Sequence, residues 1–134
     1  MTRNDDTGKL ILRLALGILI LMHGIAKISS GVGGIAGMLT SNGLPSGLAY
    51  LAYIGEVVAP ILLIVGIFTR PAALIIAINM VFAIYLAHMS QLFTIGKTGG
   101  WTLELQGMFL FTAIALAFLG AGRFSVGGIA GKYN

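Results

Sequence analysis

One stretch of the chain decides its fold class: residues 47–68, GLAYLAYIGEVVAPILLIVGIF, in which Glu56 is the one charged side chain. A helix needs about 20 predominantly apolar residues to cross roughly 30 Å of membrane hydrocarbon, and this run is long enough. The run therefore predicts a transmembrane helix with a carboxyl group inside it.

Three further apolar runs of similar length accompany it. We expect four spans, at Lys9–Ile28, Gly47–Phe68, Pro71–Gln91 and Trp101–Gly120. Only Thr69-Arg70 separates the second span from the third, so these two helices should be antiparallel neighbours. Pro71 then falls in the first turn of the third helix, where its missing N–H does no harm.

The connection between the first two spans, Ser29–Ser46, is longer. Ile35, Met38 and Leu39 share one helical face within it, and Asn42-Gly43 suits the end of a helix. We therefore predict an all-α membrane protein: a single four-helix transmembrane domain over residues 1–134, with a short interfacial helix between the first two spans.

Composition excludes several other classes of protein. Hydrophobic residues make up 57% of the chain and charged residues 9%, with a mean hydropathy of +0.99, whereas a soluble domain carries about 25% charged residues. The basic residues are dispersed, which argues against nucleic-acid binding. The sequence has no cysteine and therefore no disulfide or CxxC redox site. Because three spans follow the first, we expect that it is retained and is not a cleaved signal peptide.

The positive residues near the span ends predict the orientation. One side of the membrane would receive Arg3, Lys9, Arg70, Arg123 and Lys132, and the other Lys97 and Lys27. Since lysine and arginine favour the cytoplasm, both termini should be cytoplasmic in the inner membrane of a bacterium. Arg13 lies one turn inside the first span and should extend to the inner headgroups. Trp101 suits an outer interfacial anchor.

Besides Lys9 and Arg13 at the inner end of the first span, five ionisable residues lie in or at the ends of the spans, and these five all fall in the outer half: His23, Lys27, Glu56, His88 and Glu104. An ionisable group in hydrocarbon costs about 2.5–3.5 kcal/mol on insertion scales, so each is a candidate site residue. Glu56 is the deepest, about 13 Å from the outer end of its helix. Pro60 cannot donate a hydrogen bond to the carbonyl of Glu56, which predicts an unpaired acceptor and a kink there.

Simpler interpretations exist for most of the five. Lys27 could extend to the surface, Glu104 could serve the helix dipole, and His88 could make a structural hydrogen bond. His23 is harder to explain in this way, because Gly24 lets a neighbouring backbone approach and Lys27 lies one turn away. Asn79 and Gln106 are expected to form hydrogen bonds between helices rather than a site.

These residues carry a family resemblance. Arg13–Gly17 followed by His23-Gly24-Ile25-Ala26-Lys27, then Gly43-Leu44-Pro45, Gly55-Glu56 and Gly66–Arg70, resembles the DoxX family of small bacterial inner-membrane proteins. The resemblance runs from about Leu10 to Ser125, and its specific elements are HGxxK and GE. Gly120–Ser125 matches the family's closing pattern, although Val126-Gly127 stands where an aspartate is often found.

The resemblance implies a link to quinone-dependent oxidoreductases or to oxidant stress. It favours a membrane quinone as ligand, with its apolar tail between helices and its head met by His23, Lys27 or Tyr85. Glu56, His23 and His88 are then the candidate proton-transfer residues, and the ligand set is His23, Lys27, Glu56, Tyr85, His88 and Glu104, with no covalent cofactor and no metal.

The resemblance leaves open whether the chain is itself catalytic. Other classes also fit: a non-catalytic membrane subunit that stabilises an oxidoreductase partner or binds a lipid, and a small proton-coupled permease. Four helices offer little room for alternating access in one chain, an objection that a homo-oligomer would weaken.

Overall fold

The computed structural model describes residues 3–31 and 33–134, with the Arg3 side chain outside the described part. Its helices are α1 (Arg3–Ser30), α2 (Gly33–Ser41), η1 (Ser46–Tyr50), α3 (Leu51–Tyr53), η2 (Ile54–Val58), α4 (Ala59–Val65), α5 (Thr69–Ala87), η3 (Met89–Gln91) and α6 (Glu104–Leu119). The described residues form no strand, and their one isolated β-bridge joins Ile95 to Trp101. The predicted all-α fold is confirmed.

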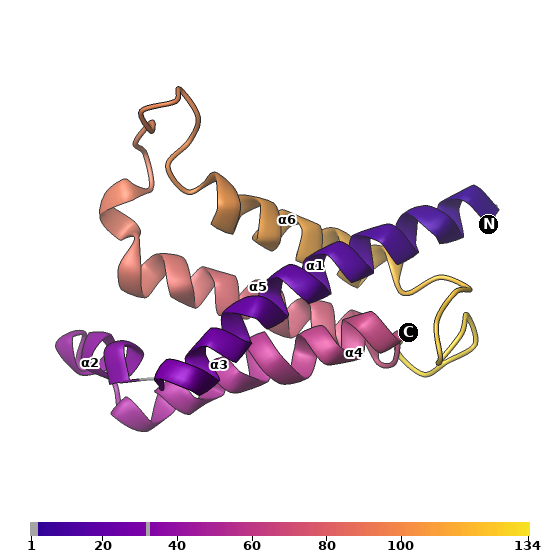
Figure 1. Ribbon diagram of the computed structural model, residues 1–134, viewed down its shortest axis with the longest axis horizontal. Coiled ribbons are helices and arrows are strands. Elements are labelled where there is room, and N and C mark those ends of the chain that lie inside the picture. Colours follow the sequence, from indigo (N-terminus) through magenta and orange to yellow (C-terminus); the bar gives the residue numbers. More distant parts are fainter. Residues whose placement is uncertain (1–2, 32) are drawn as a thin grey trace.

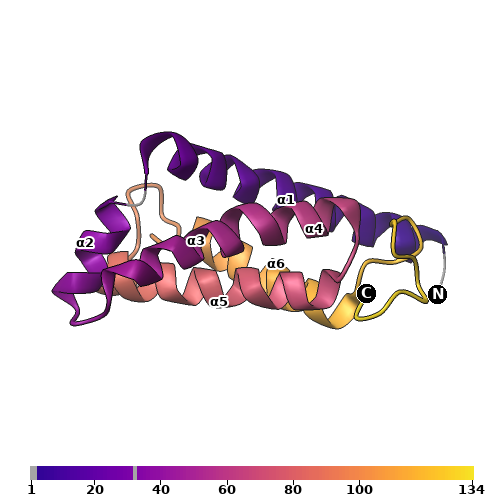
Figure 2. The same ribbon diagram turned by 90° about the horizontal axis from the view of Figure 1, so that it is seen from below.

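The four long segments form a ring of contacts. α1 packs against α4 and α6, and α5 packs against the same two helices (Figures 1 and 2). Alanines at the crossings, such as Ala59, Ala73 and Ala113, are fully buried and let the helix backbones approach closely. Larger buried side chains fill the space between them: Leu16, Ile20, Leu63, Ile76 and Leu116.

The second span is a continuous helical segment, Ser46–Val65, in which three types of helix follow one another. It starts as the 3-10 turn η1, passes through α3, widens into the π-helical turn η2, and returns to α-helix in α4. Within η2 the N–H of Ala59 bonds to the carbonyl of Ile54, five residues earlier. Pro60 is the second residue after η2 and has no N–H to donate, so the expected disturbance of the helix takes the form of a π-helical turn.

Membrane-spanning capacity is clear for three segments, Asn4–Ser30, Ser46–Val65 and Thr69–Ala87. The fourth apolar helix, α6, has 16 residues and begins at Glu104, so our predicted start at Trp101 is wrong. Trp101 instead belongs to the preceding loop, where its indole N–H donates to the carbonyl of Leu92 at 2.8 Å. Large apolar side chains point outward all around the bundle, as contact with lipid requires.

The interfacial helix also forms, as α2. The chain leaves it at Asn42, whose N–H bonds to the carbonyl of Leu39 at 3.1 Å, and Gly43 follows with a φ of +75°. That left-handed conformation is the reason for a glycine at this position. Leu39 is buried in the groove between α2 and the second span, and Ile35 packs beside it.

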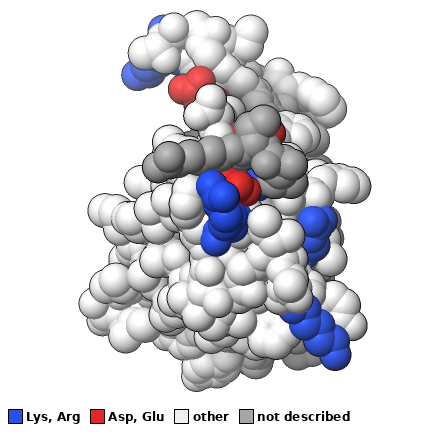
Figure 3. Space-filling model, turned by 90° about the vertical axis from the view of Figure 1, so that its right-hand side faces the viewer, with Lys and Arg blue, Asp and Glu red and all other residues white. Residues whose placement is uncertain are grey.

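Both termini lie at one end of the bundle, as an even number of spans requires (Figure 1). Lysine and arginine side chains are spread over this end, with acidic groups close to some of them (Figure 3). Near the start of α1, Asp6 is buried, accepts the backbone N–H of Arg123 at 3.1 Å and forms an ion pair with the Arg123 side chain. The cytoplasmic location of this end remains a prediction.

Arg13 does not extend to the headgroups, and here our sequence-based expectation is wrong. Its side chain is fully buried and donates to the carbonyls of Leu63, at 2.9 Å, and Phe124, at 2.5 Å. The last carbonyls of a helix have no partner within the helix, and Leu63 is in the last turn of α4. Arg13 thus joins the end of α4 to the segment after α6, which folds back over the bundle.

Candidate functional site

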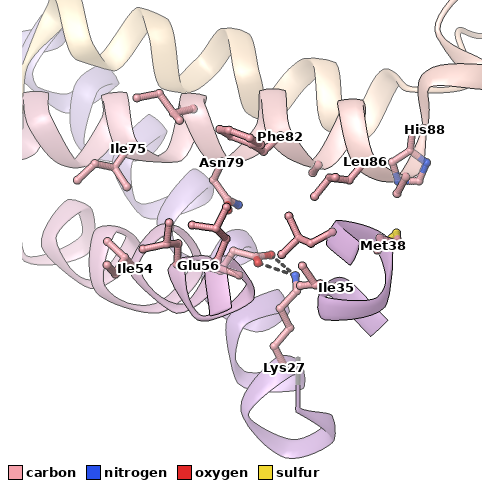
Figure 4. Close-up of a pocket in the computed structure, with 18 residues that line it drawn as sticks. Lys27, Ile35, Met38, Ile54, Glu56, Ile75, Asn79, Phe82, Leu86 and His88 are labelled. Atoms are coloured by element: carbon pink, nitrogen blue, oxygen red, sulfur yellow. Dashed lines mark hydrogen bonds and ion pairs between the residues drawn. The ribbon is translucent and has the colours of Figure 1, made fainter. Parts of the chain in front are cut away.

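A cavity of about 500 Å³ lies in the half of the bundle farther from the termini (Figure 4). Its walls come from the end of α1, from α2, from the first half of the second span and from the second half of α5. Most of its lining is aliphatic or aromatic, with polar groups only at Lys27, Glu56, Asn79 and His88. A largely apolar cavity with a few polar groups that converge is typical of a small-molecule site.

The Lys27–Glu56 ion pair is the centre of this site. The ammonium nitrogen of Lys27 lies 2.6 Å from one carboxylate oxygen of Glu56 and 2.5 Å from the other. Glu56 is buried, whereas the Lys27 side chain is 27% exposed. Lys27 therefore turns into the bundle toward the acid, and the simpler interpretation of a lysine that only extends to the surface does not describe its geometry.

The local backbone explains how Glu56 reaches this position. The carboxylate is carried by the π-helical turn η2, and its own carbonyl is the one that Pro60 cannot serve. That carbonyl lies against Gly24 of α1, so closely that a Cβ atom on residue 24 would collide with it. The glycine allows the two backbones to meet, and this contact sets Lys27, one turn further along α1, beside the acid.

Asn79 and His88 complete the polar part of the cavity. Asn79 packs over Gly55, where an added Cβ would lie 2.7 Å from its side-chain carbons. Nδ1 of His88 lies 3.0 Å from Oε1 of Gln91, and Gln106 of α6 approaches its Nε2 at 3.5 Å. The predicted hydrogen bond between helices is therefore found for Gln106, while Asn79, which we expected outside any site, lines the cavity.

Three other predicted site residues lie outside the cavity lining. His23 is exposed on α1, its Nδ1 donates to the carbonyl of Leu19 at 3.0 Å, and its ring meets the ring of Phe109 edge-on. Tyr85 is 51% exposed and does not line the cavity. Glu104 is exposed at the start of α6, beside Gly100. The structure brings together Lys27, Glu56 and His88 and leaves these three apart.

Two contributions were missed from the sequence. Asn79 is the one amide in the interior of the third apolar run, which ends at Gln91, and the cost of burying an amide in hydrocarbon is a signal that could have identified it. The second is the cover that α2 provides: Ile35, Met38 and Leu39, the residues that define its apolar face, line the cavity. Tyr53 supports the same region, because its hydroxyl donates to the carbonyl of Lys27 at 3.3 Å.

Comparison with known proteins supports a family. The DoxX family model matches residues 8–89, which include α1 from Gly8 onward, the helices α2 to α5 and the whole cavity lining. A Bacillus subtilis (strain 168) protein named "Putative oxidoreductase CatD" is 30% identical over 121 residues, covering 90% of this chain and 85% of that protein. A Haemophilus influenzae protein named "Uncharacterized protein" is 31% identical over 115 residues, or 83% of this chain and 81% of its own length.

No solved structure matches the chain. The region matched by the family model holds the HGxxK and GE elements and the ion pair built from them. The chain belongs to the DoxX family of membrane proteins.

Proposed function

We propose that the chain binds a membrane quinone, or a lipid with a similar uncharged head, in the Lys27–Glu56 cavity, as a component of a membrane oxidoreductase or oxidant-defence system. The observation that carries the proposal is the cavity itself: about 500 Å³ of mainly apolar space with one ion pair on its wall. The printed name of the Bacillus subtilis relative supports the oxidoreductase setting.

The walls of the cavity suit a ligand with an apolar tail. Several lining residues are also exposed on the outer surface of the helices, among them Leu51 at 55%, Ile78 at 51% and Phe82 at 50%. In a membrane that surface faces hydrocarbon, so the cavity borders the lipid between the second span and α5. A tail could then remain in the bilayer while the head enters, which favours a lipophilic ligand over a water-soluble one.

The polar groups suit a head that accepts hydrogen bonds. An ammonium group has three N–H donors, and two of those on Lys27 are directed at the carboxylate of Glu56. No acceptor among the described residues is found for the third, which could serve a quinone carbonyl, and the amide of Asn79 adds another donor.

Reduction of a quinone to a quinol takes up two electrons and two protons. Without cysteine, this chain has no evident electron donor of its own, so we assign the electrons to a partner oxidoreductase. Glu56 and His88 are the titratable groups that could move the protons at the cavity.

The test is binding of decylubiquinone to the protein in phosphatidylcholine nanodiscs. Lys27→Met should weaken binding about tenfold, since a hydrogen bond from a charged donor contributes about 1.5–3 kcal/mol. Lys97→Met is the matched control, because Lys97 is exposed in the loop before α6 and should leave binding unchanged. The double variant Lys27→Met/Glu56→Gln avoids an unpaired buried carboxylate and should bind as weakly as Lys27→Met.

The proposal fails if wild-type protein neither binds decylubiquinone nor yields a quinone on organic extraction. It also fails if Lys27→Met and Lys97→Met bind equally well. We further infer an inner-membrane location with cytoplasmic termini. A periplasmic signal from a reporter fused after residue 134 would contradict that orientation.

A further inference from the structure

The charge balance of the cavity sets what it can accept. Lys27 and Glu56 are the two charged side chains among the residues that line it, and the other polar groups are an amide and an imidazole. The two charges cancel at 2.5 and 2.6 Å. With His88 neutral, the wall has no net charge.

Burial makes this cancellation effective. Glu56 is 4% exposed and most of the cavity lining around it is apolar, so little water can screen an additional charge beside its carboxylate. An ionised head that enters such a site must leave water and finds no free opposite charge, because Lys27 is already neutralised. An uncharged head faces no such cost and can use the remaining N–H of Lys27.

We infer that Glu56 is a specificity-determining residue: by neutralising Lys27 it keeps anionic amphiphiles, such as fatty acids and acidic phospholipids, out of the cavity and admits uncharged heads. This inference rests on the proposed function only in that the cavity is a ligand site. It deepens that proposal by giving the acid a role in selection that is separate from proton transfer.

Three amphiphiles with the same dodecyl tail test the inference: dodecanol, dodecylsulfonate and dodecyltrimethylammonium. Their dissociation constants are measured in phosphatidylcholine nanodiscs. Wild-type protein should bind dodecanol at least about tenfold more tightly than either ion. Glu56→Gln leaves Lys27 without its counter-charge and should bind dodecylsulfonate about tenfold more tightly than wild type does, since an opposite charge in a poorly screened site is strongly attractive.

Lys27→Met provides the reverse experiment and does not depend on Glu56→Gln folding well. It leaves the Glu56 carboxylate unpaired and should gain affinity for dodecyltrimethylammonium. The double variant Lys27→Met/Glu56→Gln should gain affinity for neither ion. Asp5→Asn removes a negative charge at the other end of α1 and serves as the control for a general change in protein charge.

Equal dodecylsulfonate binding by wild type, Glu56→Gln and Asp5→Asn would overturn the inference, as would wild-type preference for the anion over dodecanol. The two proposals fail separately. If the ion preferences reverse as expected but decylubiquinone does not bind, the quinone proposal is wrong and the selection rule stands. If decylubiquinone binds and the ion preferences do not change, only the selection rule is lost.

Discussion

Arg13 and Lys27 are two cations of the same helix, α1, and the bundle uses them in opposite ways. Arg13 is fully buried at the terminal end and donates to two backbone carbonyls, those of Leu63 and Phe124. Lys27, near the other end, keeps part of its exposure and bonds to a carboxylate in a cavity. Arg13 joins two backbone segments, whereas Lys27 is neutralised by Glu56 in the wall of the cavity.

The difference follows from what each end of the bundle requires. α4 and α6 both finish near the termini, and the last carbonyls of a helix need donors from elsewhere. Arg13 serves α4, and Arg70 serves α6 through the carbonyls of Ala117 and Phe118. A rigid guanidinium with several N–H groups suits this task better than an ammonium does. At the opposite end of the bundle the acceptor is the carboxylate of Glu56 and not a backbone carbonyl. Glu56 neutralises Lys27, and two of the three N–H groups of Lys27 are directed at it.

The largest effect that we expect comes from Arg13→Met. It removes two hydrogen bonds to a charged group and leaves buried carbonyls unpaired, which should lower the free energy of unfolding by about 3 kcal/mol or more. Thermal unfolding in detergent measures the loss. Arg70→Met is the matched control: it removes the same type of contact at an exposed position, where water can replace the donor, and should cost about 1 kcal/mol. Equal losses in the two variants would contradict a special structural role for Arg13.

The next largest effect tests the close contact between α1 and η2 that sets Lys27 beside Glu56. Gly24→Ala places a methyl group against the backbone carbonyl of Glu56 and should force α1 and η2 apart. Overpacking of this kind costs about 1–3 kcal/mol, and decylubiquinone binding should weaken because the ion pair is displaced. Gly8→Ala in the same helix meets nothing within 4 Å and should be neutral or stabilising. A Gly24→Ala protein as stable as Gly8→Ala would show that the close approach is not needed.

These two sites also show how far the sequence could predict the molecule. The apolar runs and the short break between the second and the third gave the order and direction of the helices. The turn itself was misplaced: it lies at residues 66–68, and Thr69 and Arg70, the predicted connection, begin α5. Gly24 and Pro60 gave the close approach and the disturbed turn, because each depends on local chemistry. The partner of Lys27 depends on distances between helices, which no local pattern contains. Arg13 was misjudged for the same reason: its acceptor at Phe124 lies in a segment that returns from 111 residues away. His23 matched a motif spacing, but the structure leaves it exposed and outside the cavity lining.

A smaller effect should come from Asn79→Ala, which distinguishes a cavity residue from a packing residue. Removal of one neutral hydrogen-bond donor costs about 0.5–1.5 kcal/mol, so decylubiquinone affinity should fall roughly 2- to 12-fold. Thermal stability should change little, since no hydrogen bond to another described residue is found for the Asn79 side chain. Thr112→Ala, in the middle of α6 and outside the cavity lining, is the control. If Asn79→Ala binds decylubiquinone as tightly as wild type but is less stable, Asn79 is a packing residue and not a ligand-binding one.

The smallest effect should come from Glu104→Gln, which makes the same chemical change as Glu56→Gln at a carboxylate that the sequence grouped with it. Glu104 is exposed in the first turn of α6, and no described residue forms an ion pair with it, so its contribution is limited to the helix dipole, about 0.3–1 kcal/mol. Dissociation constants for decylubiquinone and dodecylsulfonate should equal those of wild type. Of these two carboxylates, Glu56 is buried and has a cation bound to it, and we infer that these two features make it selective. Altered ligand preference in Glu104→Gln would mean that a second acid acts on the cavity and that charge balance is set by the whole outer half of the bundle.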